Sequence, residues 1–216
     1  MHARPRLALL LAVLAGGCAR SVCTGTAPPS APAGAAPAVA APAPEPMTGA
    51  LPGDRIPGFR TAVRRPDGAS AREEPFDSRG TKSTTVYIVN STTCPYCNAY
   101  AGRMREIEAT YMARGVDVVH VYPNRKEPAA EKIAWHAEQG FRGGQILDVD
   151  ASIARLLEAD LTPTAFVADA GGILLYRGAI DDAASEGIPS QRYLADALDA
   201  HLAGRPVAVR STEPEG

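Results

Sequence analysis

The feature that most restricts the fold of this chain is a pair of cysteines between a strand-like segment and a helix-like segment. Residues Thr84–Asn90 are rich in β-branched and aromatic side chains and almost continuously apolar, which predicts a buried central strand. The stretch "STTCPYCNAY" follows and places Cys94 and Cys97 three positions apart. Pro95 suits the first position of a helix, where its missing N–H group costs no hydrogen bond. Apolar side chains then recur at helical spacings of three and four: Tyr100, Met104, Ile107 and Tyr111.

The rest of the chain alternates between strand and helix patterns. Residues 59–63 and 71–76 flank a Pro-Asp-Gly turn signal, which predicts an N-terminal hairpin. Helices between the early strands favour parallel pairing, and a later hairpin around "DAGG" adds antiparallel strands. The sequence therefore predicts an α/β fold, a mixed central sheet with helices on both faces. The other expected strands are 116–122, 146–149, 164–169 and 173–177, and the other expected helices are 128–139, 152–158 and 190–202.

The composition fits one globular domain with appendages. Of the 216 residues, 45% are hydrophobic and 21% are charged, and the formal net charge is −2. This balance provides no positive field for a polyanion, so we expect neither nucleic acid nor an acidic membrane surface as a partner.

The N-terminus has the pattern of an export signal. Basic residues in Met1–Arg6 precede a short apolar stretch, residues 7–15, and the sequence "GGC". The apolar stretch is too short to span a bilayer, which takes roughly 20 residues. Cys18, directly after small residues, resembles the lipobox cysteine of bacterial lipoproteins, although Ala15 stands where Leu is more usual. We expect residues 1–17 to be a lipoprotein signal peptide and Cys18 to carry the lipid that holds the protein to a bilayer. Plain secretion is the alternative.

The segment after Cys18 is too poor in large apolar residues to form a core. Residues 18–53 are dominated by Ala, Pro, Gly, Ser and Thr, which predicts a disordered, extended tether. The composition then becomes that of a compact domain, which we expect to occupy residues 54–204, with a C-terminal tail at residues 205–216.

The domain resembles a thioredoxin-fold redoxin, of the alkyl hydroperoxide reductase/thiol-specific antioxidant-like branch. The matching motifs are the N-terminal hairpin, the C-P-Y-C after a strand, "LTPT" at Leu161–Thr164, and "DAGG" followed by "YRG" at Tyr176–Gly178. The resemblance implies a thioredoxin-like three-layer fold. It also implies that Pro163 follows a cis peptide bond beside the cysteines, and that Thr162 and Pro163 present their backbone to a substrate.

The spacing of the two cysteines explains the chemistry that we expect. Unpaired N–H groups and the dipole at a helix N-terminus favour an anion, so Cys94 is expected to react as the thiolate nucleophile. Cys97 lies one helical turn further on and can resolve a mixed disulfide formed at Cys94. Pro95 and Tyr96 lie between the two cysteines, and we expect both to contact the substrate. The two thiols suffice for thiol–disulfide exchange, so no cofactor or metal is expected.

The expected substrates are protein disulfides or small thiols outside the cytoplasm. An exported thiol couple also needs an extracytoplasmic redox partner, which the sequence does not identify. We expect a periplasm-facing lipoprotein; the sequence does not distinguish inner from outer membrane, nor reductase from oxidase or isomerase.

Other functions remain possible for the same cysteines. A zinc site needs a second pair of ligands, but Cys18 and Cys23 lie outside the domain and the histidines are scattered. Copper chaperones with a thioredoxin fold usually have a C-x-x-x-C motif, one residue longer. A third alternative is a tethered binding module without enzymatic activity, in which the disulfide is structural. That disulfide would close a very small loop and would contribute little stability by loop entropy.

A thiol peroxidase is the strongest rival. Peroxiredoxins have Thr or Ser three residues before the reactive cysteine, and Ser91 occupies that place here. They also have a proline seven residues before it, where this chain has Tyr87.

Overall fold

A computed structural model of the chain describes residues 51–68, 70–183 and 187–215. The expected signal peptide, Cys18 and all but the last three residues of the expected tether lie outside the described residues. Within the described part of the chain, no helix has the length and apolar character needed to cross a membrane.

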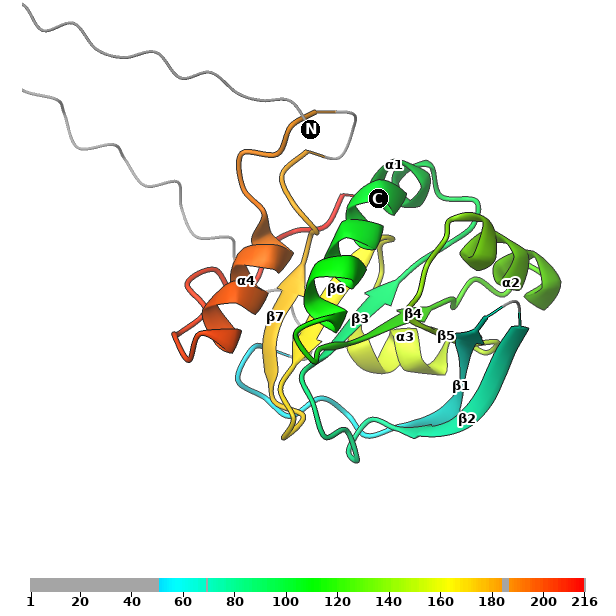
Figure 1. The fold of residues 1–216 in the computed structure, drawn as a ribbon, viewed down its shortest axis with the longest axis horizontal. Coiled ribbons are helices and arrows are strands. Elements are labelled where there is room, and N and C mark those ends of the chain that lie inside the picture. The colour runs from blue at the N-terminus through cyan, green and yellow to red at the C-terminus, as the bar shows by residue number, and fades with distance from the viewer. Residues whose placement is uncertain (1–50, 69, 184–186, 216) are drawn as a thin grey trace, which may run out of the picture. The chain divides into compact units, whose positions relative to one another are not determined.

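The centre of the domain is a seven-stranded mixed sheet in the order β2-β1-β5-β4-β3-β6-β7 (Figure 1). The inner strands β3, β4 and β5 are parallel, whereas β6 pairs antiparallel with β3 and β1 pairs antiparallel with β5. The prediction of a mixed sheet with an N-terminal hairpin is confirmed. The strands are β1 Arg60–Asp67, β2 Ser70–Asp77, β3 Thr85–Val89, β4 Asp117–Val121, β5 Gly144–Ile146, β6 Thr164–Ala168 and β7 Leu174–Gly178.

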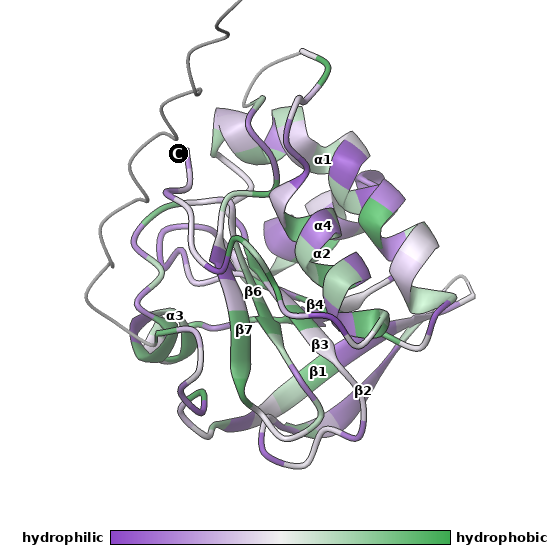
Figure 2. Cartoon of the chain, turned by 90° about the vertical axis from the view of Figure 1, so that its left-hand side faces the viewer, coloured by the Kyte–Doolittle hydropathy of each residue, from purple (hydrophilic) through white to green (hydrophobic). Residues whose placement is uncertain are grey.

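Helices cover both faces of the sheet and make a three-layer arrangement (Figure 2). On one face α1, α2 and α4 pack against Val86 and Ile88 of β3. On the other face α3 packs against Tyr87 and Val89, because successive side chains of a strand point to opposite sides. The helices are α1 Pro95–Ile107, α2 Ala129–Glu138, α3 Ser152–Leu157 and α4 Tyr193–Leu202, and α1 continues as the π-helix η1 Glu108–Met112.

Aromatic side chains from the N-terminal hairpin complete the second face. The rings of Phe59 and Phe76 lie 6.0 Å apart between centroids, and each makes an edge contact with Tyr87. Ile56 belongs to the same buried cluster. The single short helix α3 covers only part of this face of the sheet, and the hairpin therefore buries the rest.

The strand predicted at residues 146–149 lies earlier in the chain, at Gly144–Ile146. Val149, taken as part of this strand, is 67% exposed. The Asp148 carboxylate accepts hydrogen bonds from the backbone N–H groups of Ile153 (3.2 Å) and Ala154 (2.9 Å), which caps α3 and turns the chain out of the sheet. Asp148, a polar residue within the apolar stretch 146–149, therefore caps α3 instead of extending the strand.

The C-terminal tail, expected outside the domain, lies along β7. Ser211 pairs with Arg177, and the N–H of Thr212 donates to the Arg177 carbonyl at 3.1 Å. The Thr212 hydroxyl accepts from the N–H of Ala179 at 2.9 Å. Gly178 permits this approach: its φ is +137°, and a Cβ there would lie 2.3 Å from the Thr212 carbonyl oxygen. The tail thus covers part of the edge of the outermost strand.

Candidate active site

Three loops meet at one end of the sheet. The parallel strands β3 and β4 end side by side, with Val89 opposite Val121. The antiparallel strand β6 begins there, because Thr164 pairs with Val89. The loops that follow β3 and β4 and the loop that precedes β6 therefore converge, and they carry the C-P-Y-C motif, Glu127 and the Thr162–Pro163 pair.

Cys94 is the N-cap residue of α1 and Pro95 is the first helical residue. The Cys94 backbone is extended (φ −77°, ψ 121°), and its side chain is partly exposed. Its thiol donates a hydrogen bond to the carbonyl oxygen of Thr162 at 3.0 Å. The Thr162–Pro163 peptide bond is cis, the conformation that the family resemblance implies. The first cysteine therefore lies at a helix N-terminus, against the loop expected to receive substrate.

Cys97 has the opposite environment. It is fully buried in the cluster formed by α1, α2, α4 and β3. Burial raises the pKa of the Cys97 thiol, and the backbone N–H of Ser91, 3.4 Å from its sulfur, acts in the other direction. Both cysteines are present as thiols. The pair is thus asymmetric, with one sulfur accessible to a partner and the other reachable only from within the protein.

The surface around Cys94 is partly apolar. Tyr96 is 37% exposed, and Pro95 and Leu161 are also exposed. Behind them, Asn98 joins α1 to α2: its amide donates to the Cys94 carbonyl at 3.1 Å, and its carbonyl accepts from the indole N–H of Trp135 at 3.0 Å. The exposed side chains can contact a partner while these bonds hold the first turn of the helix.

Glu127 belongs to the site, although the sequence did not indicate it. The Glu127 Oε1 atom accepts hydrogen bonds from the Ser91 hydroxyl, the Thr93 N–H (3.2 Å), the Thr93 hydroxyl (3.0 Å) and the Asn124 amide (2.9 Å). In the sequence it appeared only as a charged residue before a predicted helix, a place where charges are usually exposed. No local pattern could have placed it beside a loop 36 positions away.

The features that favoured a peroxidase serve other contacts. The Ser91 hydroxyl is held by Glu127 and lies 3.2 Å from the Thr93 hydroxyl. Tyr87, in the position of the peroxiredoxin proline, is fully buried among the hairpin aromatics. The Ser91 carbonyl accepts from the backbone N–H of Cys94 at 3.4 Å, but among the hydrogen bonds found between described residues neither the Ser91 nor the Tyr87 side chain bonds to the Cys94 sulfur.

The histidines near the site belong to a buried polar network. His120 Nε2 lies 2.9 Å from Glu108 Oε1, and its Nδ1 lies 2.7 Å from the Asn90 amide nitrogen. The Tyr122 hydroxyl and His136 Nδ1 share a hydrogen bond of 2.9 Å, and burial lowers the pKa of His136 to about 3. Among the described residues, no group of three or more His, Cys, Asp or Glu side chains could hold a metal ion.

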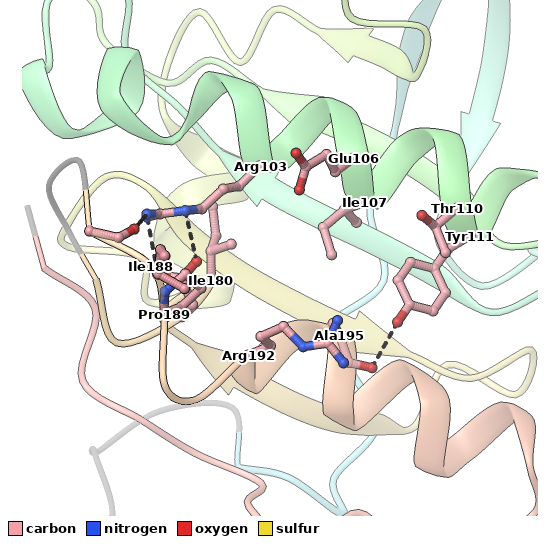
Figure 3. Close-up of a pocket in the computed structure, with 12 residues that line it drawn as sticks. Arg103, Glu106, Ile107, Thr110, Tyr111, Ile180, Ile188, Pro189, Arg192 and Ala195 are labelled. Carbon is pink, nitrogen blue, oxygen red and sulfur yellow. Dashed lines mark hydrogen bonds and ion pairs between the residues drawn. The ribbon is translucent and has the colours of Figure 1, made fainter.

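A pocket of about 330 Å³ lies away from the cysteines, between α1 and the segment that leads into α4 (Figure 3). Arg103 extends from α1 across it, forms an ion pair with Asp181 at 3.2 Å and donates to the Gly187 carbonyl. The Tyr111 hydroxyl donates to the Ala195 carbonyl at 3.0 Å. The described residues that line the pocket include neither cysteine nor Thr162, so it is separate from the thiol site.

Comparison with known proteins identifies a family and a fold. The sequence profile of the Redoxin family matches residues 51–189, more than half of the chain. An uncharacterized conserved protein from Geobacillus kaustophilus is 22% identical, with a TM-score of 0.66 over 77% of this chain and 90% of that chain. A hypothetical protein from Sinorhizobium meliloti 1021 is 23% identical, with a TM-score of 0.64 over 77% of this chain and 92% of that chain. No curated protein sequence gives a significant match. The predicted thioredoxin-like α/β fold is confirmed.

Proposed function

This chain belongs to the Redoxin family, and we propose that it is a thiol–disulfide oxidoreductase in which Cys94 is the nucleophile and Cys97 the resolving thiol. The observation that carries the proposal is the asymmetry of the pair. The Cys94 sulfur is partly exposed at a helix N-terminus, 3.0 Å from the Thr162 carbonyl, whereas Cys97 is buried behind it. An exposed sulfur at a helix N-terminus can attack a disulfide in a partner, and a buried one can attack only its neighbour.

The proposed reaction proceeds in two exchanges. The Cys94 thiolate attacks one sulfur of a substrate disulfide, forms a mixed disulfide and expels the other sulfur as a thiolate, which takes a proton from water. Cys97 then loses its proton to solvent and attacks the Cys94 sulfur, which releases the second substrate thiol. The protein ends as the Cys94–Cys97 disulfide and the substrate as a dithiol, so two electrons have moved to the substrate. The reverse sequence oxidises a dithiol.

Substrate contacts are assigned to the groups around Cys94. The proposed partner is a protein disulfide or a small thiol whose chain lies across the Thr162 backbone and Pro163, beside the exposed faces of Pro95 and Tyr96. The Thr162 carbonyl contacts the Cys94 thiol, so a substrate bound there brings its sulfur to the nucleophile. No cofactor enters the reaction, because the two thiols exchange electrons directly with sulfur in the substrate.

Single-cysteine variants test this mechanism. Cys94→Ser is expected to abolish reduction of a protein disulfide, because the nucleophile is lost. Cys97→Ser is expected to accumulate a mixed disulfide at Cys94, visible as a mass increase that a reductant removes. Full activity in Cys94→Ser, or a mixed disulfide at Cys97 in the wild-type protein, would refute the assignment.

A thiol peroxidase is the alternative, on the family membership alone. Rapid mixing with hydrogen peroxide distinguishes the two functions. An oxidoreductase is expected to react slowly with peroxide and rapidly with a protein disulfide. Oxidation of Cys94 by peroxide faster than its exchange with a disulfide would favour the peroxidase. A binding module without enzymatic activity would show neither reaction, although it would still capture a partner.

We further propose that the domain is held to a membrane outside the cytoplasm by a lipid on Cys18, where an extracytoplasmic redox partner recycles the couple. The proposal rests on the export pattern of residues 1–17 and on the cysteine that follows it. Metabolic labelling with a palmitate analogue tests it, with Cys18→Ser as the matched control. Label in the wild-type protein and none in the variant is the expected result; equal labelling of both, or of neither, would contradict lipidation at this cysteine.

A further inference from the structure

Glu127 is a buried carboxylate that the two-cysteine mechanism does not use. The side chain is 6% exposed, and its Oε2 atom is buried without a hydrogen-bond partner. The ion pairs found between described residues do not include Glu127. Burial of a carboxylate costs free energy unless hydrogen bonds or charges compensate it. The burial of Glu127 beside the loop that carries Cys94 therefore requires a physical explanation.

The compensation comes from that loop. Burial acts to raise the pKa of Glu127, but hydrogen bonds from the Ser91 hydroxyl and from Thr92 and Thr93 more than offset it and lower the pKa. The carboxylate therefore stays ionised at neutral pH. Its Oε1 atom accepts three hydrogen bonds from Ser91 and Thr93, in the loop that precedes Cys94, so the loop cannot shift without breaking several bonds at once.

Ser91 connects this network to the buried thiol. Its hydroxyl donates to Glu127, while its backbone N–H donates to the Cys97 sulfur at 3.4 Å. The N–H contact favours the thiolate form of Cys97, whose pKa burial otherwise raises. Glu127 thus fixes the side chain of Ser91, while the backbone N–H of Ser91 contacts the Cys97 sulfur.

We propose that Glu127 is a positioning residue for the second exchange step: by fixing Ser91, it keeps the Ser91 N–H directed at the Cys97 sulfur. The inference rests on the proposed function. In that step Cys97 gives its proton to solvent, its sulfur bonds to the Cys94 sulfur, and the bond from Cys94 to the substrate sulfur breaks. The N–H stabilises negative charge on the Cys97 sulfur while the new bond forms. The first step uses the exposed sulfur of Cys94, which the Ser91 N–H does not contact.

The two steps can be followed separately with the chromogenic disulfide 5,5′-dithiobis(2-nitrobenzoate). In a protein whose Cys18 and Cys23 are replaced by Ser, so that only the pair reacts, attack by Cys94 releases one coloured thiolate, and resolution by Cys97 releases a second. Glu127→Ala removes the acceptor, and we expect it to slow the second release about tenfold or more, the effect of a lost hydrogen bond to a charged group. The pH midpoint of the second release is expected to rise by about one unit, the same tenfold change in ionisation. The first release is expected to stay within about threefold of the wild-type rate.

Three other variants sharpen the test. Glu127→Gln keeps a carbonyl oxygen for the same donors, and we expect it to restore the second release to within about threefold of wild type. Glu127→Asp keeps the charge, but its side chain is one methylene shorter and its oxygens lie further from the loop. We expect this variant to slow the second release selectively, and this result does not depend on whether Glu127→Ala folds. Glu131→Gln, on the exposed side of α2, is the matched control and is expected to behave as wild type.

The outcomes separate this inference from the proposed function. If the rate and the pH midpoint of the second release are the same in Glu127→Asp and Glu127→Ala as in the wild-type protein, the positioning role is overturned but the mechanism is not. Equal slowing of both releases, with no shift in the pH midpoint, would also overturn it, because that pattern indicates general loss of structure. A wild-type protein that gives no first release would refute the proposed function and this inference with it.

Discussion

Mild acid is expected to destabilise the domain through His136, a residue of α2. Its ring is 5% exposed and lies among the rings of His120, Tyr122 and Phe141. The Tyr122 hydroxyl lies within hydrogen-bond distance of Nδ1, at 2.9 Å. Burial, with a smaller contribution from the neighbouring His120, lowers the pKa of His136 to about 3. Protonation of this ring in the folded protein is therefore strongly unfavourable.

The sign and size of the effect follow from the difference between the folded and unfolded states. An exposed histidine in the unfolded chain has a pKa of about 6.5, so the unfolded state takes up the proton first as the pH falls. The stability contributed by neutral His136 is complete well above pH 6.5 and is lost progressively below it, toward the folded pKa of about 3. Between pH 7 and pH 5 this one residue is expected to lower the free energy of unfolding by about 2 kcal/mol.

Urea denaturation followed by tryptophan fluorescence measures this loss. Trp135 is the single tryptophan of the chain and precedes His136 on α2, so its emission reports on the same region. The comparison is with His136→Asn, whose side-chain amide can still form a hydrogen bond with the Tyr122 hydroxyl but does not titrate. Both proteins share every other titrating group. The difference between their unfolding free energies is therefore expected to shrink by about 2 kcal/mol from pH 7 to pH 5.

Two results would refute this reasoning. The first is a pair of stability curves that fall in parallel, because His136 would then contribute nothing to the pH dependence. The second is a wild-type protein that gains stability relative to His136→Asn on acidification from pH 7 to pH 5, because folded His136 would then bind the proton more tightly than the unfolded chain does. Measurements in reductant keep both cysteines as thiols in the two proteins.

Two further predictions concern packing and buried charge. Gly178→Ala is expected to cost about 2–4 kcal/mol of unfolding free energy, because the new Cβ would meet Thr212 and the φ is unfavourable for alanine. Gly115→Ala, also at positive φ but with open space around it, is the control; equal losses in the two variants would contradict the clash with the tail. Glu108→Gln is expected to cost about 2 kcal/mol in urea denaturation, since an amide cannot replace both carboxylate oxygens, which accept from His120 and from the N–H groups of Arg142 and Gly143. A loss below about 0.5 kcal/mol, the range of ordinary surface changes, would show that these hydrogen bonds do not stabilise the domain.

Much of the fold followed from local patterns. The apolar run of β3, the proline that opens α1 and the turn signals of both hairpins each depend on residues within a few positions of one another, and each prediction is confirmed. The strand at 146–149 was wrong for a related reason. Its apolar residues satisfied the strand pattern, but Asp148 is bound to the N-terminus of α3 and ends the pairing at Ile146.

Some residues of the candidate site could be predicted from local sequence, and others could not. The sequence placed Cys94 and Cys97 at a helix start, because that junction is written in ten consecutive residues. The position of Pro163 came from a family resemblance rather than from periodicity. Glu127 could not be predicted at all, because nothing near it in the sequence distinguishes a carboxylate that gathers loop donors from one exposed to solvent.

The sequence by itself therefore determined the order of strands and helices and the position of the cysteine pair at a helix N-terminus. Only the tertiary structure decided that Glu127 and Ser91 meet, that the carbonyl of Thr162 lies against Cys94, and that the tail covers the edge of β7. The physical reason is the range of the interactions. Strand and helix patterns come from neighbours along the chain, whereas contacts between loops exist only after the sheet has paired β3 with β4 and β6.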